Sequence, residues 1–446
     1  MTHSLRSTLT ALVLGGLAAP AFAQPTPAPS SPADDLAKAA DATAEVANLP
    51  PADPAAPAAA APATKASSDD IDLSSLGLDP ASTATSFDDK LNIYGFADIS
   101  YSGLHWGKAV PTIEQDSRSF VVGNLNLYLS KNLTPKVRAL AEVRFSYLPN
   151  GAANPDGTTF SAYAVDVTNS SRLAQWGSSV IERLYVEYDL TDHLTIRAGH
   201  WLTPYGIWNI DHGSPAIIAV ARPYIIGEQF FPEHQTGLQL FGNHLFGSYK
   251  LNYFLTASNG RGADEAQQDL DTNVALGGRL ELEAPQGVKL GVSYYEGRYT
   301  GFAPAMGAAK PTYREMAYSA DALYDHGGLR LQGEISARDK HFEDGARTAS
   351  AAGFTSDGRD FGFYVLAGYR TTQLWNVMPY TYYEHYRPQE RPYFSGVDDF
   401  TVGLNFRPAS SFVAKLQYTY AAFADGPELL AGTSLTIYAA QAAWMF

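Results

Sequence analysis

The stretch that points to the fold begins at Leu91 and reads LNIYGFADISYS through Ser102. Every second side chain, from Leu91 and Ile93 onward, is apolar or small, and the positions between them hold polar and aromatic residues. Successive side chains of a β-strand point to opposite faces of the sheet. A period of two therefore predicts a strand with one apolar face and one mixed polar face.

The same alternation recurs to the end of the chain. In residues 121–130 the apolar set is Val121, Gly123, Leu125, Leu127 and Leu129, with polar residues and Tyr between them. Marking each such run predicts sixteen strands. They cover residues 90–103, 118–131, 136–147, 179–190, 194–201, 235–242, 246–258, 273–284, 287–299, 313–325, 328–339, 359–371, 375–387, 396–407, 411–423 and 434–446.

The connections between these strands sort by length. Those after even-numbered strands are short, such as 132–135 and 326–327, whereas most of those after odd-numbered strands are long, including 148–178 and 202–234. An even number of strands with short turns at one rim and long loops at the other is typical of bacterial transmembrane barrels. The pattern predicts an all-β, closed, antiparallel barrel of sixteen strands over 90–446.

Charge placement predicts which strand face meets lipid. The apolar positions carry essentially no Lys, Arg, Asp or Glu through the middle of the strands, and the opposite face carries nearly all the strand charges. A charged side chain facing lipid at the bilayer midplane costs about 2–4 kcal/mol. A soluble barrel would place its apolar side chains inside. We therefore expect a water-filled, charged lumen.

Composition excludes several classes of protein. The chain has 446 residues, no Cys and a formal net charge of −15, and only 17 % of its residues are charged. No run beyond the N-terminus approaches the roughly 18 apolar residues of a membrane helix. An acidic chain repels phosphate, so nucleic acid is not an expected partner. The absence of Cys excludes disulfides, thiol catalysis and Cys-ligated zinc.

Two segments precede the predicted barrel. Residues 1–23 combine Arg6, an apolar run and Ala21-Phe22-Ala23, as in a secretory signal peptide. Residues 24–89 are rich in Ala, Pro, Asp and Ser, with eleven acidic and two basic side chains, a net charge of −9. Such a composition predicts a disordered periplasmic linker. A short trimeric coiled coil over 32–47 and a contact with peptidoglycan through 24–89 are alternatives.

The C-terminal residues alternate up to an aromatic end. Phe446 ends the sequence, and Trp444, Ala442, Ala440 and Tyr438 step back by two on one face. This resembles the C-terminal signature of bacterial outer-membrane barrels, which the barrel-assembly machinery recognises. The resemblance implies that Phe446, Trp444 and Tyr438 direct membrane assembly.

A block in the middle of the chain carries a second resemblance. Residues 181–206 read IERLYVEYDLTDHLTIRAGHWLTPYG and end in a corner with Gly199, Thr203, Pro204 and Gly206; TGLQL (236–240) and LNYFLTASNG (251–260) follow. This is similar to the phosphate-selective porin O and P family and its relatives among trimeric 16-stranded porins. The resemblance implies an outer-membrane homotrimer for passive diffusion, with the long loop 202–234 folded into the lumen.

The composition of loop 202–234 agrees with an inserted position. It holds ten large apolar residues, too many for a free surface loop, although a trimer contact would also bury them. Arg222 is its only Lys or Arg. We assign Trp208, Asp211, His212 and Glu228 to the constriction. Because the loop is acidic, it departs from the basic constriction of phosphate porins.

Candidate selectivity residues lie on the predicted lumen face. They are Arg138, Arg144, Arg183, Glu187, Arg197, Arg222, Arg279 and Arg330. Arg138, Arg183 and Arg197 on three successive strands could form a basic ladder that attracts anions. The alternative is that Arg and Glu side chains pair along the wall and cancel.

No motif indicates catalysis. The sequence holds no phosphate-binding loop, no Gly-x-Ser-x-Gly elbow and no His-Glu-x-x-His. We expect no catalytic residue, no cofactor and no metal site. The leading hypothesis is an outer-membrane porin for small hydrophilic solutes or ions, including anions. An outer-membrane barrel hydrolase and a structural or adhesive barrel with a periplasmic tether are the alternatives. The partners expected are outer-membrane lipid, further copies of the chain and the assembly machinery.

Overall fold

The structure is a computed structural model. It describes residues 90–110, 115–146, 163–165, 173–175, 178–209, 213–223, 225–226, 230–261, 272–300, 312–343, 357–371, 376–388 and 394–446. The predicted signal peptide and linker, residues 1–89, lie outside these ranges. So do Asp211, His212 and Glu228.

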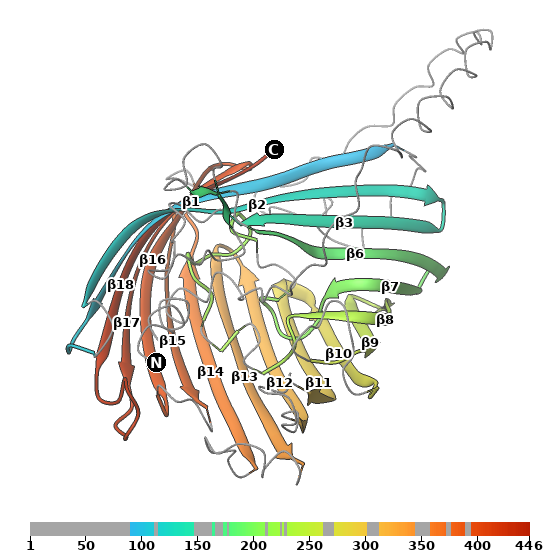
Figure 1. The fold of residues 1–446 in the computed structure, drawn as a ribbon. Coiled ribbons are helices and arrows are strands. Elements are labelled where there is room, and N and C mark those ends of the chain that lie inside the picture. Colours follow the sequence, from blue (N-terminus) through green and yellow to red (C-terminus); the bar gives the residue numbers. More distant parts are fainter. Residues whose placement is uncertain are drawn as a thin grey trace. The chain divides into compact units, whose positions relative to one another are not determined.

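Sixteen strands form one closed antiparallel barrel (Figure 1). Their bounds are β1 Leu91–Trp106, β2 Asp116–Thr134, β3 Val137–Ser146, β6 Ser178–Thr191, β7 Leu194–Leu202, β8 His234–Phe246, β9 Tyr249–Ser258, β10 Ala275–Ala284, β11 Val288–Thr300, β12 Thr312–His326, β13 Leu329–Phe342, β14 Gly358–Tyr369, β15 Met378–Arg387, β16 Val397–Ala409, β17 Phe412–Phe423 and β18 Ser434–Met445. Each predicted strand corresponds to one of these, with ends that differ by a few residues. The predicted all-β barrel of sixteen strands is confirmed.

Two short strands outside the barrel were not predicted. β4 Tyr163–Val165 and β5 Leu173–Gln175 pair with each other in the connection between β3 and β6. Within the described ranges, no helix is long and apolar enough to cross a membrane.

The barrel closes between its first and last strands. β1 pairs with β18 over eleven residues, from Phe96 opposite Met445 to Trp106 opposite Leu435. Backbone bonds between Gly95 and Phe446 extend this ladder to the last residue, in both directions at 2.9 and 3.0 Å. A closed sheet has no edge strand, so no strand is left with a row of unpaired backbone N–H and C=O groups. The alternation at the C-terminus thus completes the wall.

The two rims differ as the sequence predicts. We call the rim with short connections the turn end and the other rim the loop end. Turn-end connections span two or three residues, for example 192–193 and 327–328, except for 370–377 between β14 and β15. Loop-end connections are longer, up to 147–177 and 203–233.

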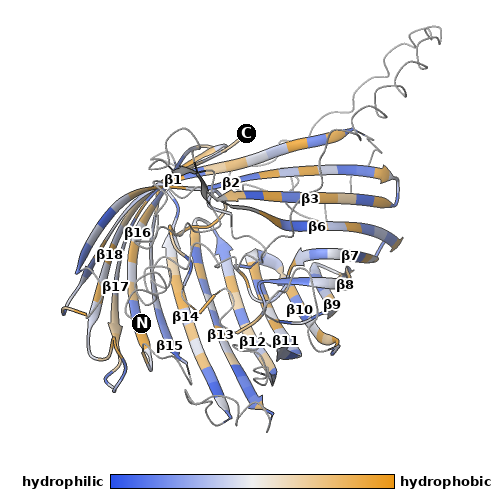
Figure 2. Ribbon diagram, in the orientation of Figure 1, coloured by the Kyte–Doolittle hydropathy of each residue, from blue (hydrophilic) through white to orange (hydrophobic). Residues whose placement is uncertain are grey.

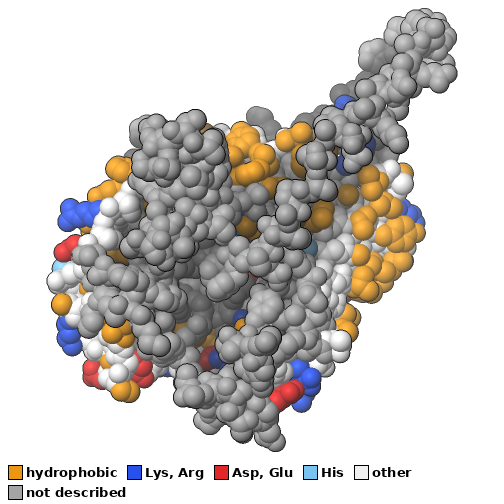
Figure 3. Space-filling model, in the orientation of Figure 1, with side chains coloured by type: hydrophobic (Ala, Val, Ile, Leu, Met, Phe, Trp, Pro, Cys, Tyr) orange, Lys and Arg blue, Asp and Glu red, His pale blue; other side chains and the backbone are white. Residues whose placement is uncertain are grey.

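Hydrophobic and hydrophilic residues alternate along the strands (Figure 2). The apolar strand positions face outward and the polar ones face the lumen. Leu255 is 61 % exposed on the outer wall, whereas Glu142 and Glu384 are fully buried inside. Figure 3 shows hydrophobic side chains gathered on the outer surface, with charged side chains toward its margins. This is the arrangement of a barrel that has a wet interior and an outer wall made for lipid.

The predicted alternation of 121–130 is wrong at its start. Val122, not Val121, is exposed with the outward set, because two residues of β2 oppose the single residue Asp98 of β1. The extra residue is a β-bulge, which shifts the face of every residue before it. It makes room for the Asp98 carboxylate, since a Cβ added at Gly123 would lie 1.8 Å from Asp98 Oδ1.

Candidate permeation pathway

The lumen is crossed by the connection between β7 and β8, residues 203–233, which we call the inserted loop. Its two ends are tied together next to the wall. Thr203 N donates to Glu233 O at 3.0 Å, Thr203 Oγ1 donates to Pro232 O at 2.6 Å, and Asn209 Nδ2 donates to Thr203 O at 2.8 Å. The loop therefore leaves and re-enters the sheet at one closed base.

Glycines allow the corner at which the loop begins. Gly199 has a φ of 137°, and a Cβ there would lie 2.2 Å from Leu184 O on the neighbouring strand. Gly206 has a φ of 72°, and its missing Cβ leaves space for the Glu334 carboxylate. Both conformations favour glycine over other residues. Between them, Tyr205 shares a 2.8 Å hydrogen bond with Thr256, and burial raises the pKa of Tyr205.

The first part of the loop docks on β13 and β14. Ile207 N donates to Glu334 Oε2 at 3.3 Å, and Trp208 Nε1 donates to the Tyr364 hydroxyl at 2.8 Å. Gln332 donates to the same hydroxyl at 2.8 Å. The predicted constriction residue Trp208 is thus buried against the wall inside the barrel.

The middle of the loop docks on β16 and β17, across the lumen. Lys415 Nζ donates to Ser214 O at 2.5 Å and to Ala219 O at 2.9 Å. Gln417 Oε1 accepts from Val220 N at 2.8 Å, and Asn405 Nδ2 donates to Ile218 O at 2.8 Å. Side chains of the wall therefore satisfy the backbone groups of a segment that has little secondary structure of its own.

The apolar content of the loop is explained by burial. Its large side chains join one cluster with aromatic residues of the wall. The loop members of this cluster are Tyr205, Trp208, Ile217, Ile218, Ala219, Ile225, Phe230 and Phe231. The inward-folded loop that the sequence predicts is confirmed. The conformational entropy that the loop loses on becoming ordered is offset by the apolar surface that it removes from water.

The predicted arginines on β3, β6 and β7 do point into the lumen, but they are paired. Arg138 reaches Asp189 at 2.5 Å and Glu187 at 3.1 Å, and Arg197 reaches Glu187 at 2.6 Å. The hypothesis of a free basic ladder is therefore wrong, and the paired wall is observed. A guanidinium held between carboxylates contributes little net field in the lumen.

A second bulge increases the number of these pairs. Arg183 and Glu182 are consecutive on β6, yet both are buried inside, because the register against β3 shifts between Glu142 and Val143. Arg183 bonds to Glu142. Glu182 forms an ion pair with Arg144 at 2.8 Å, and its Oε2 is hydrogen-bonded to His234 Nε2 at 2.8 Å.

The other predicted charges are paired as well. Arg279 bonds to Asp321 at 2.5 Å and to Glu281 at 2.8 Å. Arg330 bonds to Asp325 at 3.1 Å. Arg222 of the inserted loop forms an ion pair with Glu233 near the loop base at 2.9 Å.

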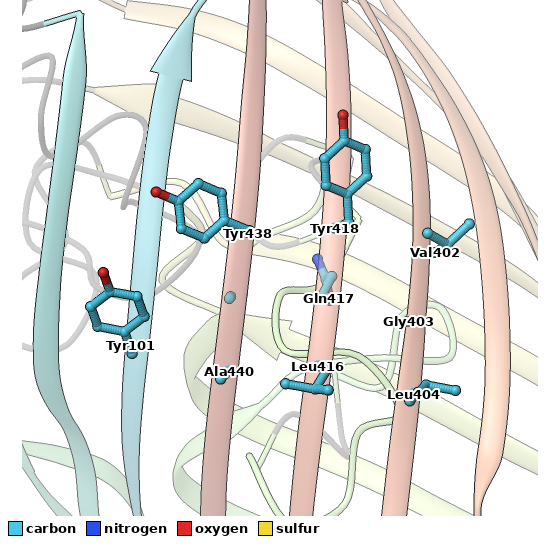
Figure 4. Close-up of a pocket in the computed structure, with 10 residues that line it drawn as sticks. Tyr101, Val402, Gly403, Leu404, Leu416, Gln417, Tyr418, Tyr438 and Ala440 are labelled. Carbon is cyan, nitrogen blue, oxygen red and sulfur yellow. The ribbon is translucent and has the colours of Figure 1, made fainter.

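Two residues of the predicted assembly signature, Tyr438 and Trp444, lie on the outer wall. Trp444 and Phe446 are exposed. Tyr438 borders a shallow groove of about 520 Å³ on the outer face of β1, β16, β17 and β18 (Figure 4). The ring of Tyr438 lies between those of Tyr101 and Tyr418 on the neighbouring strands.

Several residues that fasten the loop are not among the site residues predicted from the sequence. They are Glu334, Tyr364, Asn405, Arg407, Lys415 and Gln417. Each sits at an inward position of an alternating strand, so its face was predictable. Its contact with the loop was not, because that depends on how the loop crosses the lumen. Among the described residues, no group of three His, Cys, Asp or Glu side chains could hold a metal ion.

Comparison with known proteins gives a structural likeness only. No family model and no curated protein matches the sequence. An anion-selective porin from Comamonas acidovorans matches the structure with a TM-score of 0.51 at 12 % identity, covering 80 % of this chain and 99 % of that one. In-vitro folded OmpT, an outer membrane protein of Vibrio cholerae in a trimer form, matches with a TM-score of 0.50 at 9 % identity, with the same coverage. The chain shares the porin fold.

Proposed function

We propose that the chain is an outer-membrane porin that lets small hydrophilic solutes and ions diffuse through its lumen. The observation that supports this most is the inserted loop, which narrows the lumen and is held there by side chains of β14 and β17, across the barrel from β7 where the loop begins. A barrel closed for structural purposes alone has no need of a charged interior and a fastened constriction. The shared fold with the Comamonas porin supports the same proposal.

The paired wall suits a general diffusion pore. Arg138, Arg183 and Arg197 meet carboxylates, so the wall presents alternating charges that hydrate small solutes without strongly retaining one sign. The phosphate specificity of the family that the sequence resembles receives no support from these arginines. An anion preference is part of the proposal.

The remaining expectations extend this proposal. Residues 1–23 act as an export signal, 24–89 form a periplasmic linker, Phe446 takes part in recognition by the assembly machinery, and three copies assemble. An arm that binds peptidoglycan remains the alternative use of 24–89. Asp211, His212 and Glu228 are proposed to line the constriction with Trp208.

Single-channel recording tests the central proposal. Purified protein added to a planar lipid bilayer should give stepwise current increases, and steps in groups of three would support the trimer. Membranes that show no steps, with protein whose β-content is intact by circular dichroism, would contradict the porin function. Hydrolysis of ester or peptide substrates by the same preparation would favour the barrel hydrolase.

A further inference from the structure

The groove on the outer face of β16, β17, β18 and β1 has large apolar sides and a low floor (Figure 4). Ala440 of β18 lies directly between Tyr101 of β1 and Leu416 of β17, which are opposite it on the two neighbouring strands. Leu404 and Leu416 are exposed on the outer wall. The small side chain of Ala440 therefore leaves an apolar space of about 520 Å³ that is open away from the lumen.

At its loop end the groove meets a cation across the ring of Tyr438. Tyr438 is opposite Gly103 of β1, and Gly103 is in turn opposite Arg118 near the start of β2. A Cβ added at Gly103 would lie 2.1 Å from Tyr438 Cζ, so the ring extends across β1 through the space that the glycine leaves. The guanidinium carbon of Arg118 lies 5.9 Å from the centre of this ring. Gly103 thus allows one aromatic ring to connect the groove with Arg118.

Arg118 has no acid of its own. Arg359, another exposed arginine at the loop end of the outer wall, pairs with Asp339 at 2.6 Å. Arg118 is exposed as well, but no side chain in the described part of the chain forms an ion pair or a hydrogen bond with its guanidinium. Asp116, two residues before it, is hydrogen-bonded to His105 at 2.8 Å. The charge of Arg118 can therefore meet an anionic group from outside the chain.

An apolar groove that ends beside an unpaired cation matches an amphipathic ligand with an anionic head. Basic side chains near the surface of a bilayer attract anionic lipid headgroups, and an acyl chain fits an apolar space on a wall that faces lipid. A second copy of the chain is a less suitable occupant. It would cover Arg118 and would have to supply an acid for it, since a buried charge without a partner is costly.

We propose that the groove of β16, β17, β18 and β1 binds one acyl chain of a phosphate-bearing lipid, and that Arg118 pairs with the phosphate of that lipid. The guanidinium offers its N–H groups to the phosphate oxygens. The ring of Tyr438 lies between the headgroup and the chain. The proposal rests on the proposed location in the outer membrane, but it does not depend on conduction.

Native mass spectrometry of the full chain in detergent tests the site. Dioleoylphosphatidylglycerol, which has an anionic headgroup, should be retained at one molecule per chain and more tightly than zwitterionic dioleoylphosphatidylcholine. Arg118→Gln should weaken the binding of phosphatidylglycerol about fivefold, as expected for one cation beside an anionic headgroup, and leave phosphatidylcholine unaffected. Arg359→Gln is the matched control and should change neither, because Arg359 already has an acid.

A second variant tests the groove and covers the case in which Arg118→Gln does not assemble. Ala440→Phe would fill the space beside Leu416 and should weaken the binding of both lipids. Ala320→Phe is its control, because Ala320 is exposed on the outer face of β12 and does not border the groove. Inorganic phosphate should not displace phosphatidylglycerol, because it cannot occupy the groove.

Three results would overturn the lipid site. The first is equal affinity for phosphatidylglycerol in wild type and in whichever of the two variants assembles. The second is displacement of this lipid by inorganic phosphate. The third is an Ala440→Phe variant that falls from trimer to monomer with its lipid binding intact, since a second copy would then occupy the groove. A wild type that retains the lipid but gives no channels would leave the site standing and refute the porin function instead.

Discussion

Lys415 of β17 donates a hydrogen bond to the backbone oxygen of Ala219, almost two hundred residues earlier in the chain, at 2.9 Å. The lysine side chain is among the most deeply buried in the barrel, and its ammonium also bonds to Ser214 O. A buried ammonium requires partners for its charge and its donors. Here the partners are carbonyl dipoles of the inserted loop, so the wall and the constriction stabilise each other.

Removing that ammonium should loosen the constriction. We expect Lys415→Met, which keeps the length and loses both hydrogen bonds, to release the 214–219 segment and to raise single-channel conductance and current noise. Lys415→Arg keeps a charged donor and should stay closer to wild type. Current traces from planar bilayers measure both effects. If Lys415→Met channels match wild type in step size and noise, the loop is held by its other contacts alone.

The direction in which a strand residue faces can be tested on a single strand. Leu255 of β9 is exposed on the outer wall, whereas Asn252 of the same strand points inward and donates to Glu281 and Glu283 at 3.1 and 2.6 Å. An outward arginine at the bilayer midplane costs about 2–4 kcal/mol. Leu255→Arg should therefore reduce the amount of assembled barrel in the outer membrane.

Asn252→Arg serves as the matched change, because its new charge would meet two carboxylates in the lumen. It should assemble at wild-type levels and shift the ion preference of the channel toward anions. Heat-dependent mobility on gels reports assembly, and reversal potentials in a salt gradient report ion preference. Equal assembly of both variants would mean that Leu255 does not face lipid.

The sequence predicts the barrel well because one face of every strand meets lipid and the other meets the lumen, so apolar and polar residues alternate along each strand. Leu127 and Leu129 belong to the outward face for the same reason as Leu255, and no knowledge of neighbours is needed. The bulge at Gly123 escaped prediction since it exists to accommodate Asp98 on another strand. A bulge reverses the faces on one side of it, so Val121 was misplaced.

Predicting which side chains pair, and where the inserted loop docks, requires the register between neighbouring strands. Arg138 and Glu187 are directly opposite each other on β3 and β6, although they are 49 residues apart in sequence. From the sequence alone, alternating arginines allow both a free basic ladder and a paired wall. In the same way Lys415 resembles any other inward-facing lysine until the loop carbonyls of Ser214 and Ala219 are placed beside it.

The ion pair between Arg183 and Glu142 should show strong coupling. Glu142 is fully buried, and Arg183 is nearly so. Removing one partner of a buried pair leaves the other charge uncompensated, at a cost of about 3–5 kcal/mol. Arg183→Met and Glu142→Gln should each lower the thermal unfolding midpoint in detergent, and the double variant should recover a large part of the loss. If the loss of the double variant equals the sum of the losses of the two single variants, the two groups do not stabilise each other.

Two glycines with positive φ but different surroundings test the strand contact at the loop corner. Gly199 and Gly247 both have positive φ, at 137° and 64°. A Cβ at Gly199 would lie 2.2 Å from Leu184 O and 2.7 Å from Tyr185 Cα, whereas a Cβ at Gly247 would have no atom within 4 Å. Backbone atoms of a paired strand cannot move aside without breaking the ladder.

Gly247→Ala should therefore cost only the strain of a left-handed backbone, about 1–2 kcal/mol, and leave conductance unchanged. Gly199→Ala should cost distinctly more, because β6 and β7 must separate just before the chain enters the inserted loop. We expect it to lower the thermal unfolding midpoint further and to widen the distribution of single-channel conductances, since the base of the constriction moves with β7. Similar midpoints for the two alanine variants would show that the sheet absorbs the extra methyl group at Gly199, and that the close approach of β6 and β7 does not position the loop.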